Sequence, residues 1–295
     1  MAGLPQVSIE ISTRLLDRDQ LDLPGGTAND YRLSLALSWA ARGAWDSALA
    51  AADRFADDRE MDRYSIAATG VILGGVDPNE AIARRPDTTS AAMSQWLSGG
   101  RWATGDDRRA ELAWLDGMVA YAQADSAGVS QASETIARLR GPPEYPATSL
   151  QAFQWARQGD IGRAADTLVR IQINRRAGLR EIPHGASILM DGISRLAAAE
   201  WLLQSGDTVL ARKTLGFHWK EAPGWYGSAA TAPAASLALH RLAVVEEALG
   251  NDDLATEYYQ EFLRRYDMPP PDHQQWVDDA KESLARLIGT DPPRD

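Results

Sequence analysis

The sequence has 295 residues, with 41 acidic and 30 basic side chains and a formal net charge of −11. A surface this acidic disfavours nucleic-acid binding, because phosphate binding needs a basic surface. Since the chain has no cysteine, it can form no disulfide, thiolate nucleophile or cysteine-type zinc site.

The apolar residues predict an all-helical protein. They make up 44% of the chain, and alanine rather than β-branched residues dominates them, as is typical of closely packed helices. No run reaches the roughly 20 apolar residues of a transmembrane helix, and the N-terminus MAGLPQVSIEIS lacks the pattern of a signal peptide. We therefore expect no membrane insertion and a cytoplasmic location, or a periplasmic one if a membrane segment lies upstream.

The chain divides into an N-terminal segment, a helical domain and a tail. Residues 1–28 are ambiguous, because Val7, Ile9 and Ile11 alternate as in a strand, whereas Leu15 and Leu16 suit a helix. Residues 29–266 are predicted to form helical hairpins, and residues 267–295 a capping helix and tail. The expected helices cover 31–42, 45–55, 64–73, 78–84, 88–103, 106–123, 126–139, 146–158, 161–173, 187–204, 208–215, the hairpin 237–263, and 272–288.

Two connections are predicted to be long loops. The first covers residues 174–187, NRRAGLREIPHGAS. The second covers residues 216–232, GFHWKEAPGWYGSAATA, and is unusually aromatic.

The hairpins share a register that becomes visible when they are aligned on the residue at the turn. Small residues recur seven positions before the turn and five positions after it, where they let two helices approach closely. The turn column is Gly43, Ala124, Gly159, Gly206 and Gly250; the earlier column is Ala36, Gly117, Ala152, Ala199 and Ala243; the later column is Ala48, Val129, Ala164, Ala211 and Ala255.

These columns resemble the tetratricopeptide repeat over about residues 30–265. The resemblance implies an α-solenoid, a right-handed stack of irregular helical hairpins closed by a C-terminal capping helix. The tail is similar to the C-terminal tetratricopeptide segments of bacterial eukaryotic-like serine/threonine kinases and transcriptional regulators. That likeness rests on Leu242, Ala243, Leu249, Gly250, Ala255, Tyr258 and the run Ala285-Arg286-Leu287.

No catalytic motif is present in the sequence. The four histidines, His184, His218, His240 and His273, fall on different predicted elements. A metal site made by His240 with Glu246 or Glu247 would have a loose helical spacing. We therefore expect no enzymatic activity, no cofactor and no metal.

Two candidate binding sites follow. The family resemblance implies a concave groove lined by first-helix positions, and large apolar groups there are typical peptide anchors. The alternative is that irregular packing buries these side chains in the core. The proposed groove residues are Trp114, Met118, Tyr121, Phe153, Arg157, Glu200 and His240.

The second candidate site is the edge formed by the two long loops. Arginine donors and aromatic faces there could close over an anionic or sugar-like ligand; alternatively, the aromatic side chains pack against the outer helices. The residues are Arg175, Arg176, Arg180, His184, His218, Trp219, Trp225 and Tyr226.

The sequence therefore predicts a non-catalytic protein-interaction, sensory or scaffold module that binds a protein or peptide and belongs to a larger bacterial signalling protein. The alternative is an extracytoplasmic module that binds a small molecule or glycan at the loop edge. The sequence leaves the oligomeric state open.

Overall fold

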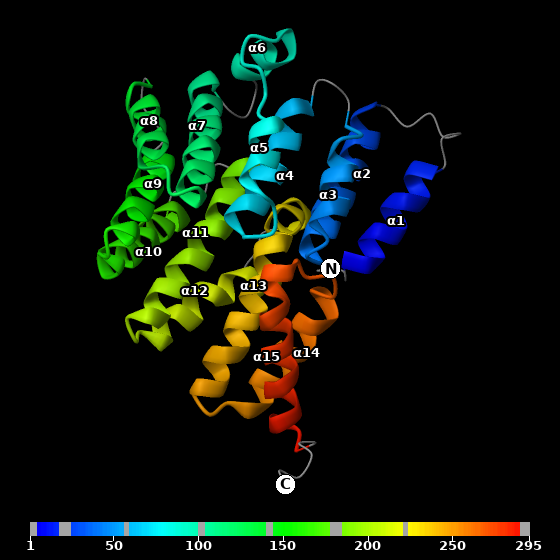
Figure 1. The fold of residues 1–295 in the computed structure, drawn as a ribbon, viewed down its shortest axis with the longest axis vertical. Helices are drawn as coiled ribbons and strands as arrows, with labels where there is room; N and C mark the ends of the chain where they lie inside the picture. The colour runs from blue at the N-terminus through cyan, green and yellow to red at the C-terminus, as the bar shows by residue number, and fades with distance from the viewer. Residues whose placement is uncertain are drawn as a thin grey trace.

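The computed structural model describes residues 5–17, 25–55, 59–99, 104–139, 144–177, 185–220 and 224–289, and every regular element within them is a helix, with one isolated bridge between Gly99 and Thr104. The first helices are α1 (Pro5–Asp17), α2 (Gly25–Ala41), α3 (Trp45–Ala52), α4 (Glu60–Ile72), α5 (Pro78–Ala83), α6 (Ala91–Leu97), α7 (Gly105–Ala122) and α8 (Ser126–Ala137). They are followed by α9 (Glu144–Arg157), α10 (Ile161–Ala177), α11 (Gly185–Gln204), α12 (Thr208–Lys220), α13 (Gly224–Ala248), α14 (Asp252–Arg265), the short 3-10 helix η2 (Pro271–His273) and α15 (Gln274–Leu287). The all-helical prediction is confirmed, and neighbouring helices pack in pairs (Figure 1).

The ambiguous N-terminal segment is helical over α1. The alternation of Val7 and Ile11 that suggested a strand does not mark a buried face, because both side chains are about half exposed. The helix instead packs on α2 through small polar groups: the Ser38 hydroxyl donates to Ser8 Oγ at 2.8 Å, and Ser8 Oγ lies 3.3 Å from Ser34 Oγ.

The turn column of the sequence is confirmed by the backbone. Gly43, Gly159, Gly206 and Gly250 have φ between +73° and +88°, and Ala124, at φ +60°, is the one non-glycine residue with positive φ in the described part of the chain. At each of these turns the turn residue donates to the carbonyl three positions back, and the next residue donates to the carbonyl five positions back, at 2.8–3.1 Å. The hairpin of α4 and α5 repeats this Schellman pattern at Gly74.

The two small-residue columns are buried, as their register predicts. Ala36, Ala199 and Ala243 are fully buried in the earlier column, and the alanines of the later column are fully buried as well. At Gly117 an added Cβ would lie 2.9 Å from both Ala132 Cβ and a methyl group of Leu150. The columns are therefore points of close approach between helices.

This packing predicts the effect of enlarging a column residue. Replacing Ala199 or Ala243 with leucine should destabilise the protein by about 1 to 3 kcal/mol, because the larger side chain must push packed helices apart. Ala248→Leu is the matched control, since Ala248 lies at the exposed end of α13. Urea unfolding followed by circular dichroism measures the difference; equal midpoints for Ala243→Leu and Ala248→Leu would contradict the packing.

Within the predicted loops at 174–187 and 216–232, all the residues that the structure describes are helical, which corrects the sequence analysis. Helix α10 continues to Ala177 and α11 begins at Gly185; α12 continues to Lys220 and α13 begins at Gly224. Glycine and proline usually interrupt helices, yet Pro233 lies inside α13. Residues 229–235 are mainly alanine, and this high helix propensity outweighs those breakers.

The last hairpin returns to the first. Helix α13 packs against α2 as well as against α11 and α14, and in Figure 1 the orange and red C-terminal helices lie below the blue N-terminal ones. Arg42 donates to both carboxylate oxygens of Asp267 at 2.7 Å, and the Met268 amide donates to the Arg42 carbonyl at 3.0 Å. In the middle of the fold, α13 packs against α2 and α11, and α4 contacts the same two helices. Each of these four helices is the first helix of its hairpin.

No helix within the described ranges combines the length and the apolar character needed to cross a membrane.

Candidate functional site

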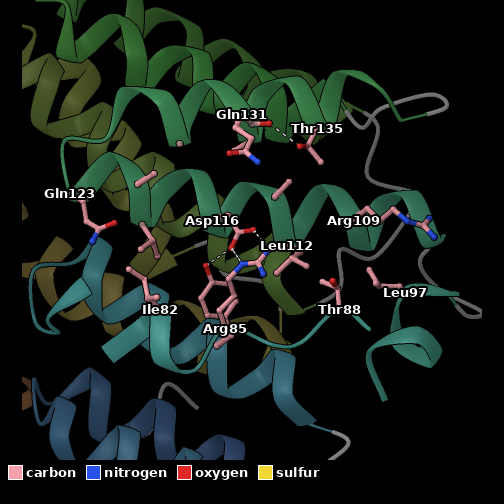
Figure 2. Close-up of a pocket in the computed structure, with 16 residues that line it drawn as sticks. Ile82, Arg85, Thr88, Leu97, Arg109, Leu112, Asp116, Gln123, Gln131 and Thr135 are labelled. Atoms are coloured by element: carbon pink, nitrogen blue, oxygen red, sulfur yellow. Dashed lines mark hydrogen bonds and ion pairs between the residues drawn. The ribbon is translucent and has the colours of Figure 1, made fainter. Parts of the chain in front are cut away.

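A groove of about 560 Å³ runs along α7. Its floor is one face of that helix, its walls come from α8 on one side and from α5 with the segment after it on the other, and Leu97 of α6 lies at one end (Figure 2). The floor residues are Arg109, Leu112, Ala113, Asp116, Val119, Ala120 and Gln123, and the wall residues include Ile82, Arg85, Thr88, Gly128, Gln131, Ala132 and Thr135.

The groove exists because α5 is short. Helix α5 has 6 residues, whereas α7 has 18 and α8 has 12, so α5 covers only part of the length of α7. Its start is well defined: the Asp77 carboxylate accepts from the Asn79 amide at 2.8 Å, and Pro78 occupies the first turn. Its end is set by Pro86, which disfavours helical geometry at the preceding residue.

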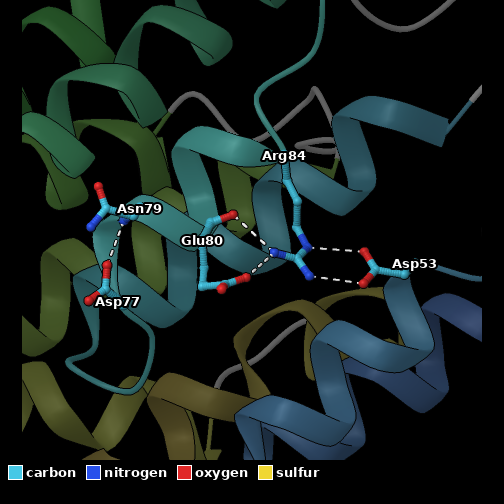
Figure 3. Close-up of polar contacts among 5 residues, drawn as sticks. All are labelled: Asp53, Asp77, Asn79, Glu80 and Arg84. Carbon is cyan, nitrogen blue, oxygen red and sulfur yellow. Dashed lines mark hydrogen bonds and ion pairs between the residues drawn. The ribbon is translucent and has the colours of Figure 1, made fainter.

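Arg84 fastens the end of α5 to α3 (Figure 3). Its guanidinium donates to the two carboxylate oxygens of Asp53 at 3.0 and 2.9 Å, and to the Glu80 carboxylate at 2.5 Å. The hydrogen bond to Asp53 is the largest of the effects that raise the pKa of Arg84. This clamp fixes the chain at the point where the next residue enters the groove.

Arg85 points the other way and reaches the middle of the groove (Figure 2). Its Nε and Nη2 donate to the two oxygens of Asp116 at 2.9 and 2.8 Å, and the hydroxyl of Tyr64 donates to the same carboxylate at 2.6 Å. Burial, together with the charge of Asp116, raises the pKa of Tyr64, so that its hydroxyl stays protonated as a donor. The Asp116 carboxylate thus holds the guanidinium of Arg85 in one orientation.

Chemically, the groove combines an apolar floor with fixed polar groups at its centre and neutral ones at its rim. Leu112, Ala113 and Val119 form the floor, with only 4–6% of their surface exposed, while Gln123 and Gln131 lie at the exposed edges. Within the described residues, no group of three or more His, Asp or Glu side chains is placed to hold a metal ion. The arrangement suits binding of an elongated ligand with hydrogen-bond acceptors.

None of the residues of the groove expected from the family resemblance lines the groove along α7, and one of them, His240, lines a second cavity. Trp114, Met118, Phe153 and His240 are buried in the core, with at most 4% of their surface exposed. They lie in α7, α9 and α13, where helices of neighbouring hairpins pack on one another. This agrees with the alternative that irregular packing makes them core residues.

The other three residues of that predicted groove lie nearer the surface. The guanidinium of Arg157 sits 4.2 Å from the ring centre of Tyr121, whose ring packs edge-on against Phe153 at 5.2 Å. Glu200 pairs with Arg241 of α13. Tyr121 and Phe153 therefore pack together, but this is an internal contact between hairpins.

The loop-edge residues lie largely outside the described part of the structure. Arg180 and His184 are not among the described residues. The backbones of the remaining six belong to α10, α12 and α13, but their side chains are not described: Arg175, Arg176, His218, Trp219, Trp225 and Tyr226. Their proposed role stays a prediction.

A second cavity, of about 620 Å³, lies between α13, α14 and α15 beside His240. The imidazole of His240 packs against the rings of Phe262 at 5.0 Å and Trp276 at 6.1 Å. Its Nδ1 lies 3.4 Å from Nη1 of Arg241 and so acts as an acceptor, which places the proton on Nε2. Burial, followed by the charge of Arg241, lowers the pKa of His240 to about 4.

This shift predicts a pH dependence of stability. Because the folded pKa of His240 is about 4 and the unfolded value is about 6.5, the unfolded chain takes up a proton between these pH values and the folded chain does not. The stabilisation is complete above pH 6.5 and is lost as the pH falls towards 4. Between pH 7.0 and 5.5, His240 should account for about 1 kcal/mol of lost stability. Urea titrations of the wild type and His240→Phe measure this; an equal loss in both proteins would exclude His240 as the cause.

Sequence reasoning missed the α7 groove, although part of its signal is present. The floor residues recur at intervals of three and four, the spacing of one helix face, but apolar residues also occupy the buried face that holds Trp114 and Met118. The wall residue Arg85 gives no local signal, since its partner Asp116 lies 31 positions away.

Comparison of this chain with protein-family models, with curated proteins and with solved structures found no match.

Proposed function

We propose that this chain is a non-catalytic protein-interaction module, built as a solenoid of hairpins similar to tetratricopeptide repeats and serving a larger signalling protein. We place the partner site in the groove along α7. The observation that carries this proposal is the groove itself: an open, elongated surface with an apolar floor and a rigidly held arginine at its centre.

The dimensions of the groove support a peptide ligand. The floor residues run from Arg109 to Gln123, a span of 14 helical steps and about 21 Å. An extended peptide advances about 3.3 Å per residue, so the groove can hold about six residues. Its volume of about 560 Å³ lies within the usual range for ligand sites.

The central polar groups support recognition rather than catalysis. The Asp116 carboxylate accepts three hydrogen bonds, two from Arg85 and one from Tyr64. Tyr64 has a raised pKa and so remains a neutral donor. Groups that satisfy one another in this way act as a preorganised binding surface, which lowers the cost of ordering the site when a ligand binds.

The test is selection of a random twelve-residue peptide library on the intact chain, followed by affinity measurement of the enriched peptides by fluorescence polarisation. Gln131→Trp should reduce their affinity at least tenfold, because the indole fills the groove from the wall of α8. Gln131 is exposed, so the fold should be retained.

Ser130→Trp is the matched control. Ser130 is the neighbouring exposed residue of α8 and is not among the groove residues, so this variant should bind as the wild type does. Enrichment of no peptide, or equal binding to both tryptophan variants, would reject the groove as the partner site.

A further inference from the structure

We propose that the groove along α7 is specific for an extended acidic segment of a partner protein, with two carboxylates about three residues apart. One carboxylate binds Arg85 and the other binds Arg109. This inference rests on the proposed function, and it adds the chemical class of the partner and the residues that select it.

The groove is less acidic than the chain as a whole. Its lining contains two arginines, Arg85 and Arg109, and one acidic residue, Asp116, and Arg109 pairs with Asp106 beside the groove, whereas the chain as a whole carries −11. The remaining polar lining residues are glutamine, threonine and Tyr64, which are neutral. A groove with balanced charge and half-exposed arginine donors can accept an acidic ligand.

Arg85 is prepared to bind a carboxylate. Its Nε and Nη2 are both engaged by Asp116, and its side chain is nevertheless 45% exposed. The guanidinium carries five N–H donors in a planar fork; after the two bonds to Asp116, the donors on Nη1 remain for a ligand oxygen. Because Asp116 is itself held by Tyr64, the guanidinium is already oriented before a ligand arrives.

Arg109 provides the second contact at the end of the groove. It pairs with Asp106 through a single contact of 3.2 Å, and its side chain is 49% exposed. Figure 2 shows Arg109 towards one end of α7 and Asp116, with Arg85, near the middle. Most of its donors are thus available to a ligand.

The spacing between the two contacts sets the spacing in the ligand. Arg109 and Asp116 are seven residues apart on α7, which is two helical turns and about 10.5 Å. An extended chain covers about 10 Å in three residues. An acidic pair at positions i and i+3 of an extended segment can therefore reach both arginines.

The groove favours an extended segment over a helix. Its volume of about 560 Å³ along about 21 Å of α7 gives an average cross-section of about 27 Å². An α-helix with side chains has a diameter of about 10 Å and so a cross-section of roughly 80 Å². A helix would leave most of its surface outside the groove.

The negative charge of the whole chain does not prevent this contact. At physiological ionic strength, exposed charges separated by more than about 8 Å are largely screened. A carboxylate at hydrogen-bond distance from Arg85 therefore interacts mainly with that guanidinium and with the Asp116 carboxylate bound to it, while distant acidic residues mostly reduce the association rate.

The experiment determines the sequences of the selected peptides and measures their affinity for variants of Arg85 and Arg138. We expect the peptides whose binding is blocked by Gln131→Trp to be enriched in Asp or Glu pairs at i and i+3. Arg85→Gln should weaken these peptides at least tenfold. Arg138→Gln is the matched control, because it removes one arginine charge from the exposed face of α8, outside the groove.

The outcomes separate this inference from the proposed function. Groove-dependent peptides without acidic pairs, or peptides that bind Arg85→Gln as tightly as the wild type, would overturn the inference and leave the proposed function standing. Absence of any groove-dependent peptide would overturn both. Circular dichroism confirms the fold of each variant, and Arg85→Lys, which keeps the charge without the planar fork, should retain part of the affinity.

Discussion

Replacing Gly43 with alanine is expected to destabilise the protein by about 3 kcal/mol, through backbone strain and steric overlap combined. Gly43 has φ +85°, a conformation that L-residues with a side chain rarely adopt. An alanine Cβ would also lie 2.8 Å from the carbonyl oxygen of Met268 and 2.9 Å from the ring of Tyr266. Tyr266 is 1% exposed and cannot move aside easily.

Gly159→Ala is the control for this prediction. Gly159 has nearly the same φ, +88°, but an added Cβ there meets no atom within 4 Å. Its replacement should cost only the backbone strain, about 1 kcal/mol. Urea unfolding of the two variants measures the difference; equal losses of stability would show that the C-terminal segment does not pack on the first turn.

Replacing Trp114 with alanine should destabilise the protein by about 3 to 5 kcal/mol, because it removes a large side chain from a packed interior. Trp114 is fully buried, and its indole N–H donates to the Ser149 hydroxyl at 2.6 Å. The change would thus leave a cavity between α7 and α9 and remove one of the two hydrogen bonds of the Ser149 hydroxyl, which still donates to the Pro146 carbonyl. Thermal and urea unfolding measure the loss.

Trp155→Ala is the comparison for this second prediction. Trp155 is only partly buried, and its ring carries the guanidinium of Arg163 at 3.7 Å. Its replacement should cost about 1 kcal/mol. If Trp114→Ala were no more destabilising than Trp155→Ala, Trp114 would be a surface residue, as the family-derived groove had placed it.

The turn register was predictable because a local rule controls it. Glycine at a helix end favours positive φ, and small residues at fixed distances from the turn mark where two helices touch. Ala124 shows the strength of the combined pattern: alanine alone gives no turn signal, yet its place between Gly117 and Val129 identified the turn, and its φ is +60°.

The exposed face of α7 was not predictable in the same way. The family register assumes an open concave surface, but here α13 packs against both α2 and α11 and fills the middle of the fold. Trp114 and Met118 are buried where α7 packs on α4 and α9, while Leu112 and Val119, apolar residues of the same helix that are also largely buried, line the groove. With apolar side chains on both faces, hydrophobic periodicity could not choose between them.

The Arg85–Asp116 pair depends on tertiary structure in the same way. The sequence around it, Arg84-Arg85-Pro86, indicates only a helix end. Arg84 pairs with Asp53, at the end of α3, and Arg85 pairs with Asp116, on α7. Each partner is 31 residues away in the sequence. No local pattern relates an arginine to a carboxylate at that distance, so the centre of the site required the folded structure.

The most direct test of the account is to find where a selected peptide lies on the chain. A peptide enriched on the wild type would carry a photoreactive benzophenone at its centre, and mass spectrometry would identify the labelled residues after irradiation. We predict labels on the groove segments 82–88, 109–123 and 128–135. Labels confined to residues 174–187 or 216–232 would contradict the groove and place the site at the edge formed by those segments.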